Sequence, residues 1–171
     1  MSLTITVLGT PAPQGSKRHV GNGVMVESSA KVKPWREAVK HAALDVLYGL
    51  DKGRVNRVNP PPMDGPLAAE MVFTVRKPVS APKRRRTWPD RMPDLSKLVR
   101  ATEDALVDAG AIVDDARIVE LHTAKRYPGE GEHALGSPGA WIRITEIPDE
   151  TDLPSAEDVR GILRDRNEET P

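Results

Sequence analysis

The sequence predicts an α/β (α+β) fold in which a small mixed β-sheet is flanked by two main helices. Four segments have the apolar pattern of strands and two have that of helices, in the order strand, helix, strand, helix, strand, strand. The length of 171 residues suits one domain of ordinary size. We therefore expect one folded domain over residues 1–147, followed by a tail over residues 148–171.

The first elements are a strand, a loop and a helix. Leu3 to Leu8 alternates apolar and polar residues with a period of two, which indicates a strand. Gly9 to Arg18 is a loop punctuated by proline and glycine, and Gly21-Asn22-Gly23 indicates a tight turn. Pro34 suits the first turn of a helix, whose apolar residues recur at helical spacing as far as Gly49.

A second strand lies between two irregular segments. Residues 50–66 are polar and include three consecutive prolines, so they predict a surface connection. The strand is expected over Pro66 to Arg76, although Ala69 and Val72 blur its alternation. Pro78 to Pro93 is rich in proline and in basic residues, which predicts a basic loop without regular structure.

The second helix is the best defined element. From Asp94 to Ala109 the apolar residues fall within one arc of a helix, and Gly110 suits the position just after its end. A turn at Asp114-Asp115 then leads to two further strands, over residues 118–127 and 140–147.

Charge is unevenly distributed although the net charge is zero. Residues 147–171 contain eight acids and three bases, and residues 155–166 can form a short helix. Residues 76–100 contain nine bases and two acids, a net charge of +7. Such a stretch indicates a polyanionic partner, because Lys and Arg that neutralise phosphates release counterions. A loop that is merely solvated has the same composition.

Composition excludes several classes of protein. The chain has no cysteine, which excludes disulfide-stapled and thiolate-metal proteins and fits a cytoplasmic location. No apolar run is long enough to span a membrane and the first residues lack a signal-peptide pattern, so we expect neither membrane association nor export. A glycine-rich phosphate loop is missing, so no nucleotide cofactor is expected.

Carboxylates at the two ends of the second helix are candidates for chemistry. Asp94 opens the helix, and Asp114 and Asp115 follow its far end. The predicted helix is about 24 Å long at 1.5 Å per residue. Asp94 and Asp115 therefore meet only if the next strand brings them together or if Asp115 belongs to a neighbouring subunit. An antiparallel return would instead bring Lys125 to Asp94, and a plain N-cap role for Asp94 is also open.

Four short blocks of sequence occur in a specific order. They are Gly9-x-Pro11-x-Pro13-Gln14-Gly15-Ser16-Lys17-Arg18, then Pro93-Asp94-Leu95-Ser96-Lys97-Leu98-Val99-Arg100 with Asp104-Ala105-Leu106 and Ala109-Gly110, then Asp114-Asp115, and then Lys125-Arg126-Tyr127. In order and spacing these blocks resemble the RusA family of Holliday-junction resolvases. The resemblance covers about residues 4–147 and leaves out the acidic tail.

The resemblance implies a set of site residues. In the family the helix begins Asp-x-Asp-Asn, with a Lys four positions after the second Asp, and an Asp-Asp pair follows the helix. By this correspondence Asp94 and Asp115, the second Asp of the pair, are metal ligands, and Asp114 is a further candidate ligand. Asp94 and Asp115 are also catalytic, together with Arg100 at the Lys position.

One part of the motif is altered. The second Asp is replaced by Ser96 and the Asn by Lys97, so one anionic Mg²⁺ ligand is missing. Asp104, Asp114 or a water molecule could fill the vacant ligand position.

The resemblance implies a homodimeric, Mg²⁺-dependent endonuclease, with Mn²⁺ able to substitute, that resolves four-way DNA junctions in recombination and repair. Paired symmetric nicks fit the twofold symmetry of a dimer. Arg100 would act electrostatically, because Arg stays protonated. The remaining predicted contacts are to the DNA backbone: Lys17, Arg18, Lys83, Arg84, Arg85, Arg86, Lys97, Lys125 and Arg126.

Two alternatives stay open at this point. With Ser96 in the motif, the protein could bind branched DNA and cut it weakly or not at all. An unrelated α/β protein could use its basic loop to bind an acidic protein partner. Metal binding separates the first alternative from the nuclease, and affinity for nucleic acid separates both from the second.

Overall fold

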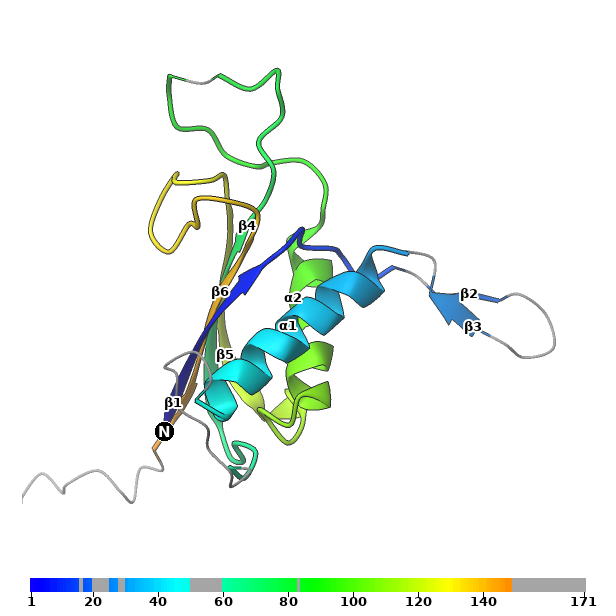
Figure 1. The fold of residues 1–171 in the computed structure, drawn as a ribbon, viewed down its shortest axis with the longest axis vertical. Coiled ribbons are helices and arrows are strands. Elements are labelled where there is room, and N and C mark those ends of the chain that lie inside the picture. The colour runs from blue at the N-terminus through cyan, green and yellow to red at the C-terminus, as the bar shows by residue number, and fades with distance from the viewer. Residues whose placement is uncertain (16, 20–24, 28–29, 50–59, 83, 149–171) are drawn as a thin grey trace, which may run out of the picture.

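The computed structural model describes residues 1–15, 17–19, 25–27, 30–49, 60–82 and 84–148. These residues form a four-stranded mixed sheet, two helices packed on one of its faces and a separate two-stranded hairpin (Figure 1). The predicted α+β fold with two main helices is confirmed. The helix expected in the tail lies outside the described residues.

The elements follow the predicted order. They are β1 (Ser2–Leu8), β2 (Lys17–His19), β3 (Met25–Glu27), α1 (Val32–Leu47), β4 (Leu67–Thr74), α2 (Leu95–Asp108), a short 3-10 turn (Asp115–Arg117), β5 (Ile118–Arg126) and β6 (Gly139–Glu146). The six predicted helices and strands agree in type, and their ends agree within two residues. The described part of the loop from residue 78 to residue 93 contains no helix or strand, as predicted.

The hairpin corrects one prediction. The sequence predicts a loop over Gly9 to Arg18, whereas Lys17–His19 and Met25–Glu27 pair as antiparallel strands. Each strand has only three residues, which is too short for an alternating pattern to be recognised. The hairpin projects away from the sheet and helices (Figure 1). The tight turn predicted at residues 21–23 lies outside the described residues.

The topology of the sheet decides where the ends of α2 lie. The strand order is β1-β6-β4-β5, and only β4 and β5 pair in parallel. A parallel pair needs a crossover, and α2 supplies it. Because β4 and β5 run in the same direction, α2 must run back between them. Its first residue therefore lies at the sheet end where β4 and β5 finish.

The core lies between the sheet and the two helices. Trp35 of α1 is buried, and its ring centroid lies 6.4 Å from that of Phe73 in β4. The indole Nε1 donates to Thr102 Oγ1 of α2 at 3.2 Å, and this hydroxyl donates to the Leu98 carbonyl at 2.9 Å. One tryptophan thus joins both helices and a central strand with its polar atom satisfied.

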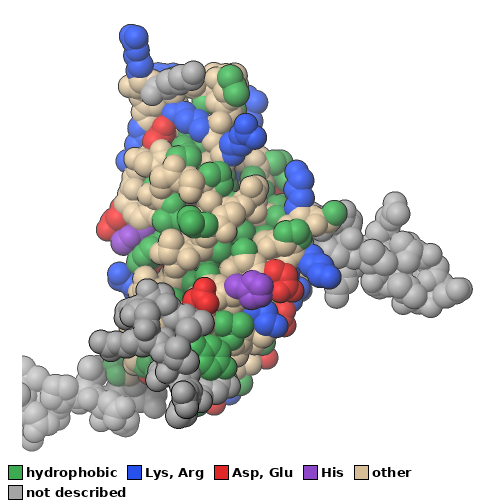
Figure 2. Space-filling view, viewed as in Figure 1, with side chains coloured by type: hydrophobic (Ala, Val, Ile, Leu, Met, Phe, Trp, Pro, Cys, Tyr) green, Lys and Arg blue, Asp and Glu red, His purple; other side chains and the backbone are tan. Residues whose placement is uncertain are grey.

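Two loops extend past the same end of the sheet (Figure 1). One joins β4 to α2 and is the predicted basic loop, and the other joins β5 to β6. Lys and Arg side chains gather at this end of the molecule (Figure 2). Within the described residues, no helix is long and apolar enough to cross a membrane.

Candidate active site and nucleic-acid interface

Asp94 occupies the N-cap position of α2 but does not use its side chain as a cap. Its backbone is extended (φ −66°, ψ 131°), and its carboxylate accepts no capping hydrogen bond. Instead, Oδ2 lies 3.2 Å from Nζ of Lys97, and 44% of the Asp94 side chain is exposed. Asp is among the best N-cap residues, so a carboxylate that leaves the helix N–H groups uncapped is free for another ligand.

The end of β5 meets the segment that precedes Asp94. Nζ of Lys125 donates to the carbonyl oxygens of Arg91 at 2.8 Å and Pro93 at 2.9 Å. An antiparallel return after α2 therefore brings Lys125, not Asp115, to the start of the helix. The Lys125 ammonium holds the backbone that leads into Asp94, and one of its three N–H donors remains for a phosphate.

The first loop also packs against the start of α2. The amide of Gln14 donates to the Lys97 carbonyl at 2.9 Å. This contact places the loop that leads to β2 beside the first turn of the helix. Lys17 and Arg18, both predicted DNA contacts, lie in β2.

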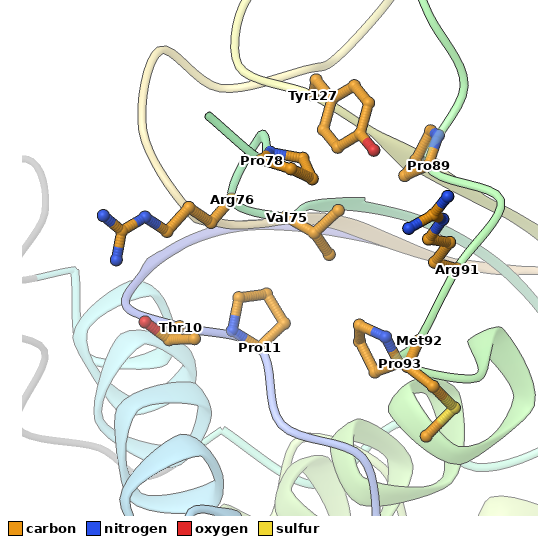
Figure 3. Close-up of a pocket in the computed structure, with 10 residues that line it drawn as sticks. All are labelled: Thr10, Pro11, Val75, Arg76, Pro78, Pro89, Arg91, Met92, Pro93 and Tyr127. Atoms are coloured by element: carbon orange, nitrogen blue, oxygen red, sulfur yellow. The ribbon is translucent and has the colours of Figure 1, made fainter. Parts of the chain in front are cut away.

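A proline-lined cleft opens between the first loop and the segment before α2 (Figure 3). It has a volume of about 210 Å³ and is lined by Thr10, Pro11, Val75, Arg76, Pro78, Pro89, Arg91, Met92, Pro93 and Tyr127. The guanidinium groups of Arg76 and Arg91 lie on opposite sides of it (Figure 3). Guanidinium groups bind phosphate oxygens in a planar, bidentate manner, so this cleft suits a DNA backbone beside Asp94.

The other end of α2 is acidic. Asp114 caps the 3-10 turn, with Oδ1 accepting from the amide of Ala116 at 2.8 Å. Burial, then the nearby charges of Asp115 and Asp104, raise the pKa of Glu103, and Arg100 opposes them. Asp115 therefore lies close to Glu103 in the folded chain. Glu103 is nine residues after Asp94, or about 14 Å farther along the helix.

Asp104 does not lie beside Ser96 to replace the missing carboxylate. Its Oδ2 lies 3.3 Å from Nη1 of Arg36 in α1, and the same arginine holds Asp108 at 2.7 Å through Nη2. These ion pairs join α1 to the second half of α2. Within the described residues, no group of three or more His, Asp or Glu side chains is arranged to hold a metal ion.

A strip of side chains along α2 connects the two ends. Ser96, Arg100 and Glu103 follow each other at spacings of four and three residues, so they share one face of the helix. Ser96 and Arg100 are exposed and Glu103 is half-buried. Glu103 was not among the site residues predicted from the sequence. Its spacing from Arg100 is the signal that could have identified it.

Basic loops lie at the end of the small sheet where α2 begins, and this arrangement suits a protein that binds a polyanion. The family model for the endodeoxyribonuclease RusA matches residues 9–134, more than half of the chain. The chain belongs to this family, as its motifs indicate. Membership of this family implies junction-resolving endonuclease activity. Proteins of the family act on branched DNA and generally depend on divalent metal ions. No curated protein matches the chain.

Proposed function

We propose that this protein is a homodimeric, Mg²⁺- or Mn²⁺-dependent endonuclease that resolves four-way DNA junctions by paired symmetric nicks. One observation carries the proposal. Asp94 precedes α2 and Asp115 follows it, and no group of three or more His, Asp or Glu side chains in the described part of one chain is arranged to hold a metal ion. Two chains related by a twofold axis near the middle of α2 would bring the Asp94 end of each to the Asp115 end of the other.

The edge of the sheet next to α2 suits this dimer. β5 is an edge strand, and three apolar side chains in or near it are exposed: Val113 at 44%, Val119 at 63% and Leu121 at 47%. Exposed apolar side chains beside an unpaired strand edge favour association with another chain. We assign this edge to the contact between the two copies.

The donor set of such a dimer fits a hard divalent cation, because it consists of carboxylate oxygens. Asp94 of one copy would hold the ion with Asp115 of the other, and Glu103, next to Asp115, is a third candidate ligand. When bound, the ion would lower the pKa of a water molecule and stabilise charge on the phosphate oxygens. Arg100, on the same strip of α2, would add a permanent positive charge beside the phosphate.

The remaining roles fall to the basic side chains. Lys97 neutralises Asp94 at 3.2 Å, and a divalent cation held by Asp94 would compete with this ion pair. Arg76 and Arg91 flank the cleft beside Asp94 and would orient the DNA backbone. The other proposed backbone contacts are those expected from the sequence: Lys17, Arg18, Lys83, Arg84, Arg85, Arg86, Lys97, Lys125 and Arg126.

A mixing experiment tests the composite site. Asp94→Asn and Asp115→Asn proteins should each be inactive by themselves, but a heterodimer formed from them would contain one composite site with both carboxylates intact. The mixture should therefore regain single-strand nicking of a synthetic four-way junction in Mg²⁺ or Mn²⁺, while linear duplex stays uncut. If both carboxylates came from one chain, every site in the mixture would carry a substitution and no nicking would return.

A second function is favoured by Ser96 and by the Asp94–Lys97 ion pair, which both reduce the negative charge available to a metal ion. In that case the protein recognises branched DNA without cutting it. Tight junction binding, with no nicking by the unmodified protein in either metal ion, would establish this function in place of the first.

A further inference from the structure

Trp88 is an exposed indole on the basic loop between β4 and α2. Its side chain is 60% exposed, whereas Trp35 is 2% exposed and Trp141 is 9% exposed. Both buried tryptophans have a structural role, because Trp35 lies in the core and Trp141 stacks on His133 with a centroid distance of 3.6 Å. Trp88 is the one tryptophan of the chain with a large surface left for a ligand.

Two guanidinium groups converge on this indole. Cζ of Arg86 lies 4.5 Å from the ring centroid, and Cζ of Arg126 lies 5.0 Å from it. Both arginines also pack against Gly131, where an added Cβ would lie 2.9 Å from Nη2 of Arg86 and 3.1 Å from Nε of Arg126. Because Gly131 has no side chain, the guanidinium groups of Arg86 and Arg126 fit beside it. Most of the indole stays exposed.

The loop that carries Trp88 is held at its base. The carboxylate of Glu130 accepts hydrogen bonds from Nζ of Lys77 and, at 3.0 Å, from the amide of Thr87. These bonds keep the pKa of Glu130 below its usual value, the Lys77 bond having the larger effect. Thr87 precedes Trp88, so the indole is attached to a fixed point of the fold.

A concave surface of about 500 Å³ lies beside the indole. Its charged lining consists of Arg85, Arg86 and Arg91 against a single carboxylate, that of Asp90. Pro78, Arg91 and Tyr127 line this surface and also the cleft beside Asp94. The two hollows are therefore adjacent, and a strand lying in the cleft at Asp94 can continue past Trp88.

We propose that this surface, the Trp88 site, binds an unpaired nucleotide of a DNA strand. The base would lie against the exposed part of the Trp88 indole, and its phosphate would contact Arg85 or Arg91. An aromatic side chain inside a basic groove is the arrangement that binds single-stranded nucleic acid, because every base has a face that can stack. An acidic protein would use the arginines but has no need of an exposed indole. The choice of DNA as the nucleic acid rests on the proposed function.

Binding of a fluorescein-labelled six-thymidine oligonucleotide tests the site by fluorescence anisotropy at constant salt concentration. Trp88→Ala should weaken binding about 10-fold, within the range found for loss of one stacked base. Trp88→Phe should restore most of the affinity. Val79→Ala is the matched control, because Val79 is an 86% exposed apolar residue of the same loop that does not line the Trp88 site.

Tryptophan emission gives a second measurement. Saturating oligonucleotide should quench the emission of the unmodified protein and leave that of Trp88→Phe unchanged, because the other two indoles are covered. The proposal is overturned if Trp88→Ala binds the oligonucleotide as tightly as the unmodified protein does, or loses no more affinity than Val79→Ala. Efficient competition by blunt duplex of equal nucleotide concentration would also overturn it.

Junction cleavage separates this proposal from the proposed function. A protein that cuts junctions while Trp88→Ala binds the oligonucleotide normally keeps its nuclease function and lacks the Trp88 site. If the protein neither binds nor cuts junctions but its oligonucleotide binding depends on Trp88, the nuclease function fails and the Trp88 site stands.

Discussion

The two ends of α2 differ in charge, and the difference indicates how the site is assembled. At the first end, the Asp94 carboxylate pairs with Lys97, and Lys125 binds the backbone that leads into Asp94. At the other end, the carboxylates of Glu103 and Asp115 lie close together. The first end therefore suits phosphates, and the second suits a cation.

The two ends of α2 also differ in whether their carboxylates are neutralised by a nearby positive charge. Asp94 has its own counterion 3.2 Å away. Glu103 is half-buried beside like charges, and its raised pKa records the cost of ionising it there. The Asp94 end is basic and the Glu103 end is acidic, so the two ends are complementary in charge. Such complementarity is expected of two surfaces that meet across a twofold axis.

The largest effect is expected at the first end. Asp94→Asn should lower the rate of junction cleavage by more than about 100-fold, beyond the loss seen when residues that merely support a ligand are changed. Junction binding should stay equal or become tighter, because a negative charge beside the phosphates is removed. Single-turnover cleavage and anisotropy titrations measure the two quantities.

The fold should tolerate this substitution. Asn caps helices about as well as Asp, and the Asp94 carboxylate makes no capping hydrogen bond. Asp45→Asn, in an exposed position of α1, is the control. Parallel loss of folding and cleavage in Asp94→Asn would show that Asp94 is a structural residue.

A second effect concerns DNA affinity and the basic loop. Replacing Lys83, Arg84, Arg85 and Arg86 with Ala should reduce the slope of log K against log salt by up to about 4, or one for each phosphate that the loop no longer neutralises. Lys33→Ala, an exposed lysine of α1, is the control and should leave the slope unchanged. If the fourfold variant keeps the full slope, the loop does not contact the DNA backbone.

A smaller effect is expected from restoring the motif. Ser96→Asp should lower the Mg²⁺ concentration for half-maximal cleavage by about 10-fold, the lower end of the range for changes around a metal ligand. Without metal ions the added charge should reduce stability, and titration with Mg²⁺ should recover it. Ser137→Asp, in the exposed β5–β6 loop, is the control.

The metal dependence of that variant also tests position 96. An unchanged requirement for Mg²⁺ would place residue 96 outside the site. Full activity in Ser96→Ala together with loss of activity in Asp104→Asn would transfer the ligand role to Asp104, despite its ion pair with Arg36.

The smallest effect lies at the second end and depends on pH. Because the pKa of Glu103 is raised in the folded protein, folding favours its protonated form. The contribution is fully present below pH 4.5, the ordinary value, and is lost as the pH rises through the raised pKa. Glu103→Gln should therefore make metal-free protein more stable than the unmodified protein at pH 7, and nearly equal at pH 4.

Urea unfolding in the presence of a chelator measures this difference. Glu37→Gln, an exposed residue of α1, should keep the pH profile of the unmodified protein. A Glu103→Gln profile that falls with pH as the unmodified one does would show that the Glu103 carboxylate is not under strain at this end of α2.

The sequence by itself determined the elements and the family. Strands such as β1 and helices such as α2 show their period in the chain, because one face of each is buried against the core. Asp94, Asp115 and Arg100 are predicted as site residues from the sequence, because the resemblance to the RusA family implies them at these motif positions. The two short hairpin strands were missed, because three residues do not show a period.

Only the tertiary structure decided which of these residues meet. The parallel pairing of β4 and β5 makes α2 run back along the sheet, which sends Asp94 to Lys125 and leaves Asp115 beside Glu103. It also gathers Arg86 and Gly131 from two different loops, and Arg126 from the end of β5, around Trp88. Such contacts join residues far apart in the chain, and they follow from the direction of the strands, which no local pattern of side chains records.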